Sequence, residues 1–400
     1  MLESIFNSLI IENSVPEDLQ TPHPNQRLIL FGRPWLELQL FAQQIDHIPI
    51  DQNNWESLYG LCQDQKLITD ILAALRNMHD IMSEFGNSMA VRQQIEGDSS
   101  YLSSETPPDT ISAHIIWFIS NMQEASDDFE YILTSLKDVL SSSSGSEEER
   151  ADRLKAILIG QDGLISTAMD MKQKNHDLIR KFGLFLSRLK EAKIELQKYI
   201  RTQSKLLSEA AKQLDIYVDD LEKLQVTSQN ACVQWLDHTI ETQNALLPIA
   251  NVSAGLIFPV PFFTSENLNL EGKRTIKAYN SLVEELSIEE EEVQKKAHLV
   301  LDLAGTNYTL DLVDQTLFEI QAQLELIENL WINTLQDLNN ISNNSSIEQL
   351  SSFIWVKKTL QVDTSTGLWH CMSRLCQDFI SSSLVNFYQE HHWGQEFPTN

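Results

Sequence analysis

The residues of this chain that could carry enzymatic chemistry form only weak patterns. Ser187 and Lys190 match the SxxK spacing in which a lysine can activate a serine nucleophile, but so short a pattern arises by chance. The phosphate-binding motif GxxxxGK[ST], the dinucleotide-binding motif GxGxxG, the zinc-protease motif HExxH, the hydrolase motif GxSxG and the redox motif CxxC are all absent from the sequence. We therefore expect no catalytic residue and no enzymatic activity.

Histidines and cysteines close together in the sequence are candidates for metal ligands. His370 lies beside Cys371 and near Cys376, and His391 is followed by His392. Neither group has the ligand spacing of a closed zinc site, so we expect no metal and no other cofactor. Because the cysteines are few and Cys371 and Cys376 have poor geometry for a disulfide on one helix, we expect free or buried thiols.

A charge-free apolar segment offers different chemistry, the transfer of side chains from water into lipid. No formally charged residue occurs from Thr242 to Ser265, but three prolines and Gly255 divide this run. A straight span of about 20 residues is therefore not expected, and a bent loop or two short arms meeting near 253–255 is favoured. The residues predicted to bind a membrane are Leu246, Leu247, Ile249, Val252, Leu256, Ile257, Phe258, Val260, Phe262 and Phe263.

A small basic cluster follows the apolar segment. Lys273, Arg274 and Lys277 are suitably placed for contact with lipid headgroups, although Glu266 and Glu271 dilute their charge. The alternative is that these cations are simply the solvated start of a helix. Equally, the apolar segment could be an ordinary buried connection between two helices.

Two long windows without internal proline flank this segment, and they must position it. Apolar residues recur in both windows at spacings of three and four, which is the pattern of a narrow stripe that packs helix on helix. Examples are Phe182, Phe185, Leu189, Leu196, Leu317, Ile320, Leu324, Ile327 and Trp331. The spacing predicts an all-α fold, namely an elongated helical bundle with a long antiparallel coiled-coil stalk and an apolar tip.

This layout predicts three regions. Residues 1–180 and 336–400 form a helical bundle, the tail domain; residues 181–244 and 266–335 form the antiparallel stalk; and residues 245–265 form the hydrophobic tip. Within the tail domain we expect residues 1–60 to be irregular, helices over 61–91 and 110–140, and a final helical region over 347–388. Glu147, Glu148 and Glu149 suit the amino terminus of a further helix.

Charge limits the classes of partner. The formal net charge of −28 argues against binding to nucleic acid, because contacts with phosphates need clustered Lys and Arg. Any attachment to a membrane would have to be apolar or led by a receptor. The amino terminus, beginning Met1-Leu-Glu-Ser-Ile-Phe, lacks a basic region and a small-residue cleavage site, so we expect no classical signal peptide.

The layout as a whole resembles the cytolysin A superfamily of α-helical pore-forming toxins. It is most similar to the α-xenorhabdolysin type component A of a binary toxin, with the haemolysin BL and non-haemolytic enterotoxin components as related types. The similarity covers most of the chain as architecture. Two segments carry it in sequence, Ile48-Pro-Ile-Asp-Gln-Asn-Asn-Trp-Glu-Ser-Leu-Tyr-Gly-Leu-Cys62 and Leu326-Ile-Glu-Asn-Leu-Trp-Ile-Asn-Thr-Leu335.

The resemblance implies a secreted, soluble monomer that meets a target-cell membrane, releases its tip and assembles into a pore with its own copies or a second toxin subunit. The proline content of the tip departs from the family pattern, so the chain could line the pore or anchor a partner that does. Two other hypotheses remain open: a soluble coiled-coil scaffold or tether whose apolar tip binds a protein partner, and an enzyme with a helical fold.

Overall fold

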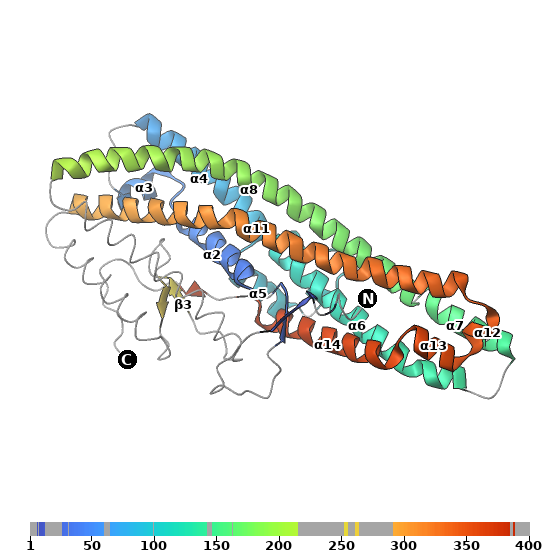
Figure 1. Cartoon of the computed structure of the whole chain (residues 1–400). Coiled ribbons are helices and arrows are strands. Elements are labelled where there is room, and N and C mark those ends of the chain that lie inside the picture. Colours follow the sequence, from blue (N-terminus) through green and yellow to red (C-terminus); the bar gives the residue numbers. More distant parts are fainter. Residues whose placement is uncertain are drawn as a thin grey trace.

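The computed structural model of the chain shows an elongated bundle of helices (Figure 1). It describes residues 6, 8–12, 26–30, 32–59, 65–98, 100–141, 146–161, 163–214, 252–254, 261–263, 291–384 and 387–388. The helices of the bundle are α2 (Arg33–His47), α3 (Gln52–Tyr59), α4 (Gln65–Phe85), α5 (Ser88–Gly97), α6 (Ile111–Ser141), α7 (Glu147–Ile159), α8 (Leu164–Leu214), α11 (Glu291–Asn344), α12 (Ile347–Ser351), α13 (Phe353–Thr359) and α14 (Val362–Ser382). A 3₁₀ turn, η2, spans Tyr101–Ser103.

Helices α8 and α11 form the long antiparallel pair that the heptad spacing predicts. Asn175 of α8 donates from Nδ2 to the carbonyl oxygen of Leu324 across 3.0 Å, and His176 contacts Glu328 across 3.2 Å. The predicted apolar stripes of both helices are buried where side chains are described, from Phe182 to Leu196 and from Leu317 to Trp331. The all-α elongated fold is therefore confirmed.

A second pair, α6 and α14, packs beside the first and carries an aromatic cluster. The ring of Trp369 lies 4.4 Å from Phe129, 5.5 Å from Trp331 and 5.1 Å from Phe6, measured between centroids. These rings join α6, α11, α14 and the amino-terminal segment. Since Phe129, Trp331 and Trp369 are almost fully buried, the cluster is a central part of the core.

The amino-terminal region is more helical than the sequence indicates. The expectation of irregular structure over residues 1–60 is wrong for α2 and α3, which both contribute to the core through Trp35 and Trp55. The prolines caused the error, because Pro34 occupies the first turn of α2, where a missing N–H costs nothing. The helix expected over 61–91 is instead divided, because Gly86, at φ +93°, ends α4.

Helix α7 begins where the sequence predicts a helix start, and a capping residue is present there. Ser146 and Glu149 form a reciprocal capping box at the start of α7, and Glu147 to Glu149 all lie in its first turn. The predicted helix start at this acidic run is therefore confirmed. The final helical region is divided into α12, α13 and α14, with Gln361 in the left-handed conformation, at φ 49°, between the last two.

Five short strands complete the described structure. Strands β1 (Ile10–Glu12) and β2 (Gln26–Leu28) pair with each other in antiparallel fashion. Strand β3 (Val252–Ala254) lies between β4 (Pro261–Phe263), antiparallel to it, and β5 (Phe387–Tyr388), parallel to it. Because these strands are only two or three residues long, the fold class remains all-α.

Candidate functional site

The weak enzymatic pattern lies on the outer surface of α8. The hydroxyl of Ser187 donates to the carbonyl oxygen of Gly183 across 3.0 Å, one helical turn earlier, and both Ser187 and Lys190 are exposed. A hydroxyl that is engaged with its own helix is not poised as a nucleophile. The arrangement has no feature of a serine–lysine catalytic pair.

The candidate metal ligands have other roles where they are described. Nδ1 of His370 contacts a carboxylate oxygen of Glu130 across 3.0 Å, which links α14 to α6. Cys376 is fully buried, and burial raises the pKa of its thiol far above the usual value. Among the described residues no group of three or more His, Cys, Asp and Glu side chains converges on one point. His391 and His392 lie outside the described residues.

The apolar segment lies in the connection between the two long helices. The end of α8 and the start of α11 lie at the same end of the bundle, so the chain from residue 215 to residue 290 leaves and returns there (Figure 1). Of the predicted membrane-binding residues, Val252 lies in β3, and Phe262 and Phe263 lie in β4. The others lie outside the described residues: Leu246, Leu247, Ile249, Leu256, Ile257, Phe258 and Val260.

The strands of this segment form a hairpin with a defined register. Val252 is opposite Phe263, Ser253 is opposite Phe262, and Ala254 is opposite Pro261. The expectation that two arms meet near residues 253–255 is wrong, because residues 252–254 form one strand and pair with residues 261–263. Lys273, Arg274 and Lys277 lie outside the described residues, so their contact with headgroups stays a prediction, as does the position of the tip as a whole.

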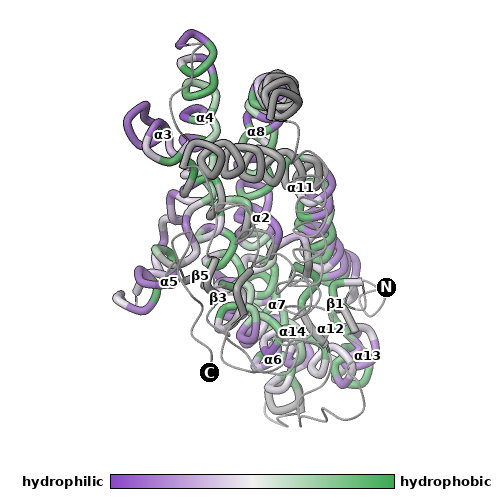
Figure 2. Tube along the Cα trace, turned by 90° about the vertical axis from the view of Figure 1, so that its left-hand side faces the viewer, coloured by the Kyte–Doolittle hydropathy of each residue, from purple (hydrophilic) through white to green (hydrophobic). Residues whose placement is uncertain are grey.

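The third strand ties this hairpin to the flank of the bundle. Phe387 of β5 pairs with Val252, and Phe387 follows Ser383 by four residues, which span at most about 14 Å. The carbonyl oxygen of Ser383 accepts hydrogen bonds from Trp35 Nε1 at 2.7 Å and from Gln39 Nε2 at 2.9 Å. Strand β3 therefore lies near α2, and Figure 2 shows β3 and β5 on the side of α2 away from α8.

Helix α4 covers part of the stalk. The ring of Phe85 stacks on Phe185 of α8 with centroids 6.2 Å apart, and Glu84 forms a two-pronged ion pair with Arg188. Helix α2 contacts the other stalk helix, where the hydroxyl of Thr316 donates to a carboxylate oxygen of Glu37 across 2.5 Å. The stalk is thus flanked by α2 and α4 along this stretch, and the domain boundaries proposed at 180/181 and 335/336 stay predictions.

A buried histidine near the start of α6, His114, has an unusually low pKa. His114 is 3% exposed, and its Nδ1 has no hydrogen-bond partner among the described residues. Burial, reinforced by the positive charge of Lys181, lowers the pKa of His114 to about 4, while Asp177 opposes the shift. Lys181 itself donates to the carbonyl oxygens of Pro108 and Asp109, and burial lowers its pKa as well. The site therefore holds a neutral imidazole at neutral pH.

No described helix is both long enough and apolar enough to cross a bilayer.

Solved structures of bacterial toxin components are similar to this chain along almost its whole length. Soluble SmhA of the tripartite α-pore-forming toxin Smh from Serratia marcescens matches with a TM-score of 0.57 at 11% identity, covering 90% of this chain and 95% of that one. The HblL1 toxin component of Bacillus cereus matches with a TM-score of 0.52 at 15% identity, covering 90% and 96%. Motility Associated Killing Factor B of Vibrio cholerae matches with a TM-score of 0.51 at 14% identity, covering 91% and 92%.

The chain has the fold of these toxin components. The fold implied by the resemblance to the cytolysin A superfamily is therefore confirmed. The sequence matches no family model and no curated protein. At identities of 11 to 15%, the likeness to the toxin components is one of fold.

Sequence reasoning missed two features of the described structure. One is the pairing of β3 with β5, which joins residues far apart in the chain through strands too short to show alternation. The other is a cavity of about 240 Å³ where α6, α8, α11 and the α13–α14 junction meet. The left-handed residue Gln361 lies at its edge, and no sequence motif marks it.

Proposed function

We propose that this protein is a subunit of an α-helical pore-forming toxin. In this proposal it binds target-cell membranes through the apolar segment and then oligomerises, with its own copies or with a second subunit, into a pore. Support comes from the fold shared with toxin components, together with one observation about the chain: the charge-free segment lies between two long antiparallel helices that end together. The proposed subunit is not an enzyme and needs no cofactor.

Transfer of the apolar segment into lipid supplies the free energy in this proposal. Burial of a large apolar side chain is worth about 1.5–3 kcal/mol, so the ten predicted membrane-binding residues together favour insertion by more than ~10 kcal/mol before the costs of ordering are subtracted. Lys273, Arg274 and Lys277 would add contacts with headgroups. A net charge of −28 gives no general attraction to anionic lipid, so the apolar contribution must dominate.

The strand pairing suggests how the segment is held before it meets a membrane. In the described structure β3 is hydrogen-bonded to β5, close to the junction of α2 with Ser383. Any movement of the whole segment into a bilayer separates these strands, because β5 follows α14 in the bundle. We therefore interpret the β3–β5 pairing as a feature of the soluble monomer that is lost on insertion.

Partners and localisation follow from the same proposal. SmhA belongs to a tripartite toxin, and its structure was solved in the soluble form. By analogy, this chain would be secreted, remain soluble until it meets a target membrane, and require one or more further components for full activity. The lipid membrane is the proposed partner at the apolar segment, and no contact with nucleic acid is proposed.

Dye release from liposomes tests the proposal, with purified protein alone and together with a candidate second component. We expect Leu256→Asp to abolish release, because a buried carboxylate opposes entry into lipid. Ile354→Asp is the matched control: Ile354 is 80% exposed on α13, so the same chemical change there should leave release intact. Equal release by the wild type and the Leu256→Asp variant would overturn the proposal.

A further inference from the structure

A cavity beside the junction of α13 and α14 has the character of a small-molecule site. It has a volume of about 240 Å³ and is bounded by α6, α8, α11 and the start of α14. One molecule of water needs only ~10–15 Å³ measured this way, so the cavity can hold an organic molecule of moderate size. Because four separate segments form it, it is a feature of the folded bundle alone.

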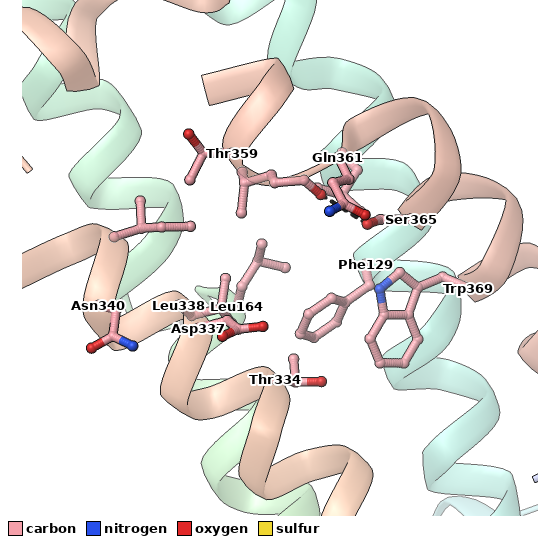
Figure 3. A pocket seen from close by; sticks show the side chains of 13 residues that line it. Phe129, Leu164, Thr334, Asp337, Leu338, Asn340, Thr359, Gln361, Ser365 and Trp369 are labelled. Atoms are coloured by element: carbon pink, nitrogen blue, oxygen red, sulfur yellow. Dashed lines mark hydrogen bonds between the residues drawn. The ribbon is translucent and has the colours of Figure 1, made fainter. Parts of the chain in front are cut away.

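Apolar and aromatic side chains form part of the cavity wall, and polar side chains form the rest. Phe129 and Trp369, with ring centroids 4.4 Å apart, form one wall, and Leu164 and Leu338 lie opposite (Figure 3). All four side chains are at most 4% exposed. Trp331 stacks on Trp369 with ring centroids 5.5 Å apart, which extends the aromatic wall into the core. A flat or slender apolar body would fit against it, as is usual for ligand pockets.

Two polar side chains of α11 also line the cavity, and they indicate which polar group a ligand there would carry. The hydroxyl oxygen of Thr334 is buried and has no hydrogen-bond partner among the described residues, although helical threonines commonly bond back to their own helix. Asp337, one turn later on the same helix, is half-buried and its carboxylate extends toward Phe129 (Figure 3). A buried polar group without a partner is uncommon in proteins and requires an explanation.

The chemistry of these two groups selects a cation. A carboxylate and an unpaired hydroxyl oxygen, one helical turn apart, can both accept hydrogen bonds from an ammonium group, which has three donors. The net charge of −28 further disfavours an anionic ligand. Gln361, with its left-handed backbone at the edge of the cavity, adds the kind of strain that collects at binding sites.

We propose that this cavity binds a small amphiphilic amine, with an aromatic or aliphatic body against Phe129 and Trp369 and its ammonium group at Asp337 and Thr334. Such a ligand touches α6, α11 and α14 at once. It therefore stabilises the described arrangement against any state in which α11 separates from α14. The proposal is independent of the proposed membrane activity.

Three probes of nearly equal size test the proposal on the full chain: 4-phenylbutylamine, 4-phenylbutan-1-ol and 4-phenylbutyrate. Binding is measured by calorimetric titration and by the rise in melting temperature. We expect affinity to fall in the order amine, alcohol, carboxylate. Failure of all three to bind at about 5 mM, or preference for the carboxylate, would overturn the proposal.

Two variants locate the binding. Asp337→Asn should weaken the amine about 3–10-fold and leave the alcohol nearly unchanged, because only the charge is removed. Leu338→Phe places a ring in the cavity and should abolish binding of amine and alcohol alike, with helical content checked by circular dichroism. The control is Glu96→Gln, an exposed neutralisation on α5, which should leave all three affinities as in the wild type. Amine binding unchanged in both Asp337→Asn and Leu338→Phe would place it elsewhere and refute the assignment.

Discussion

Replacement of His114 by glutamine is expected to remove about 2 kcal/mol of the stability that this protein loses between about pH 7.5 and about pH 5. His114 is 3% exposed near the start of α6, and its Nδ1 has no partner among the described residues. Burial, with Lys181 as a secondary cause, lowers its pKa to about 4, while the imidazole of an unfolded chain titrates near about 6.5. Asp177 is the acidic group that opposes this shift.

The direction of the pH dependence of stability follows from whether the folded or the unfolded chain takes up a proton on His114 first as the pH falls. As the pH falls below about 6.5, the unfolded chain protonates His114 while the folded chain does not, so unfolding becomes more favourable. The stabilising contribution is complete above about pH 6.5 and is lost as the pH falls to about 4. Between about pH 7.5 and about pH 5 the loss is about 2 kcal/mol, and over the whole interval it is about 3 kcal/mol.

The assay is urea unfolding at a series of pH values, followed by circular dichroism. The wild type should lose about 2 kcal/mol of unfolding free energy from this site between about pH 7.5 and about pH 5, and His114→Gln should lose that much less. Ile354→Gln is the control, because Ile354 is 80% exposed and carries no titratable group, so its replacement should leave the wild-type slope in place. Parallel slopes for the wild type and His114→Gln would show that the buried imidazole is not the cause.

Two further predictions concern the segment and the core. A disulfide between Ser253→Cys and Tyr388→Cys, which are register partners of β3 and β5, should block dye release until a reductant is added, and release that is equal before and after reduction would contradict the proposed separation of these strands. Trp331→Ala should lower the unfolding free energy by about 3–5 kcal/mol, because it empties the centre of the aromatic cluster. Phe318→Ala, at a side chain 69% exposed, should change it by less than about 0.5 kcal/mol, and a similar loss in both variants would contradict the described core.

The parts of the fold that were predictable from sequence are those set by local periodicity. The three-and-four spacing of apolar residues identified the seam of α8 and α11, because a narrow stripe on a helix must face another helix. The acidic run after Ser146 identified the start of α7, because its capping box lies within four residues. Both features depend on residues that are close together in the sequence, which is why they could be predicted from it.

The parts that were not predictable depend on contacts between distant residues. Pro34 suggested irregular chain, yet the first turn of a helix tolerates proline, and only the docking of Trp35 on Ser383 reveals the place of α2. The β3–β5 pairing and the cavity beside Trp369 likewise join segments separated by more than a hundred residues. Most of the apolar segment lies outside the described residues, so its position as a tip stays a prediction.

The most direct measurement of the central claim is the environment of residue 256 before and after the protein meets a membrane. An environment-sensitive fluorophore is attached at Leu256→Cys in a variant whose native cysteines are replaced by alanine, with the same label at Ile354→Cys as the control. On addition of liposomes we expect a blue shift and quenching by lipid-embedded quenchers at position 256, and neither at position 354. An unchanged spectrum at position 256, under conditions in which the wild type releases dye, would contradict the claim that the apolar segment enters lipid.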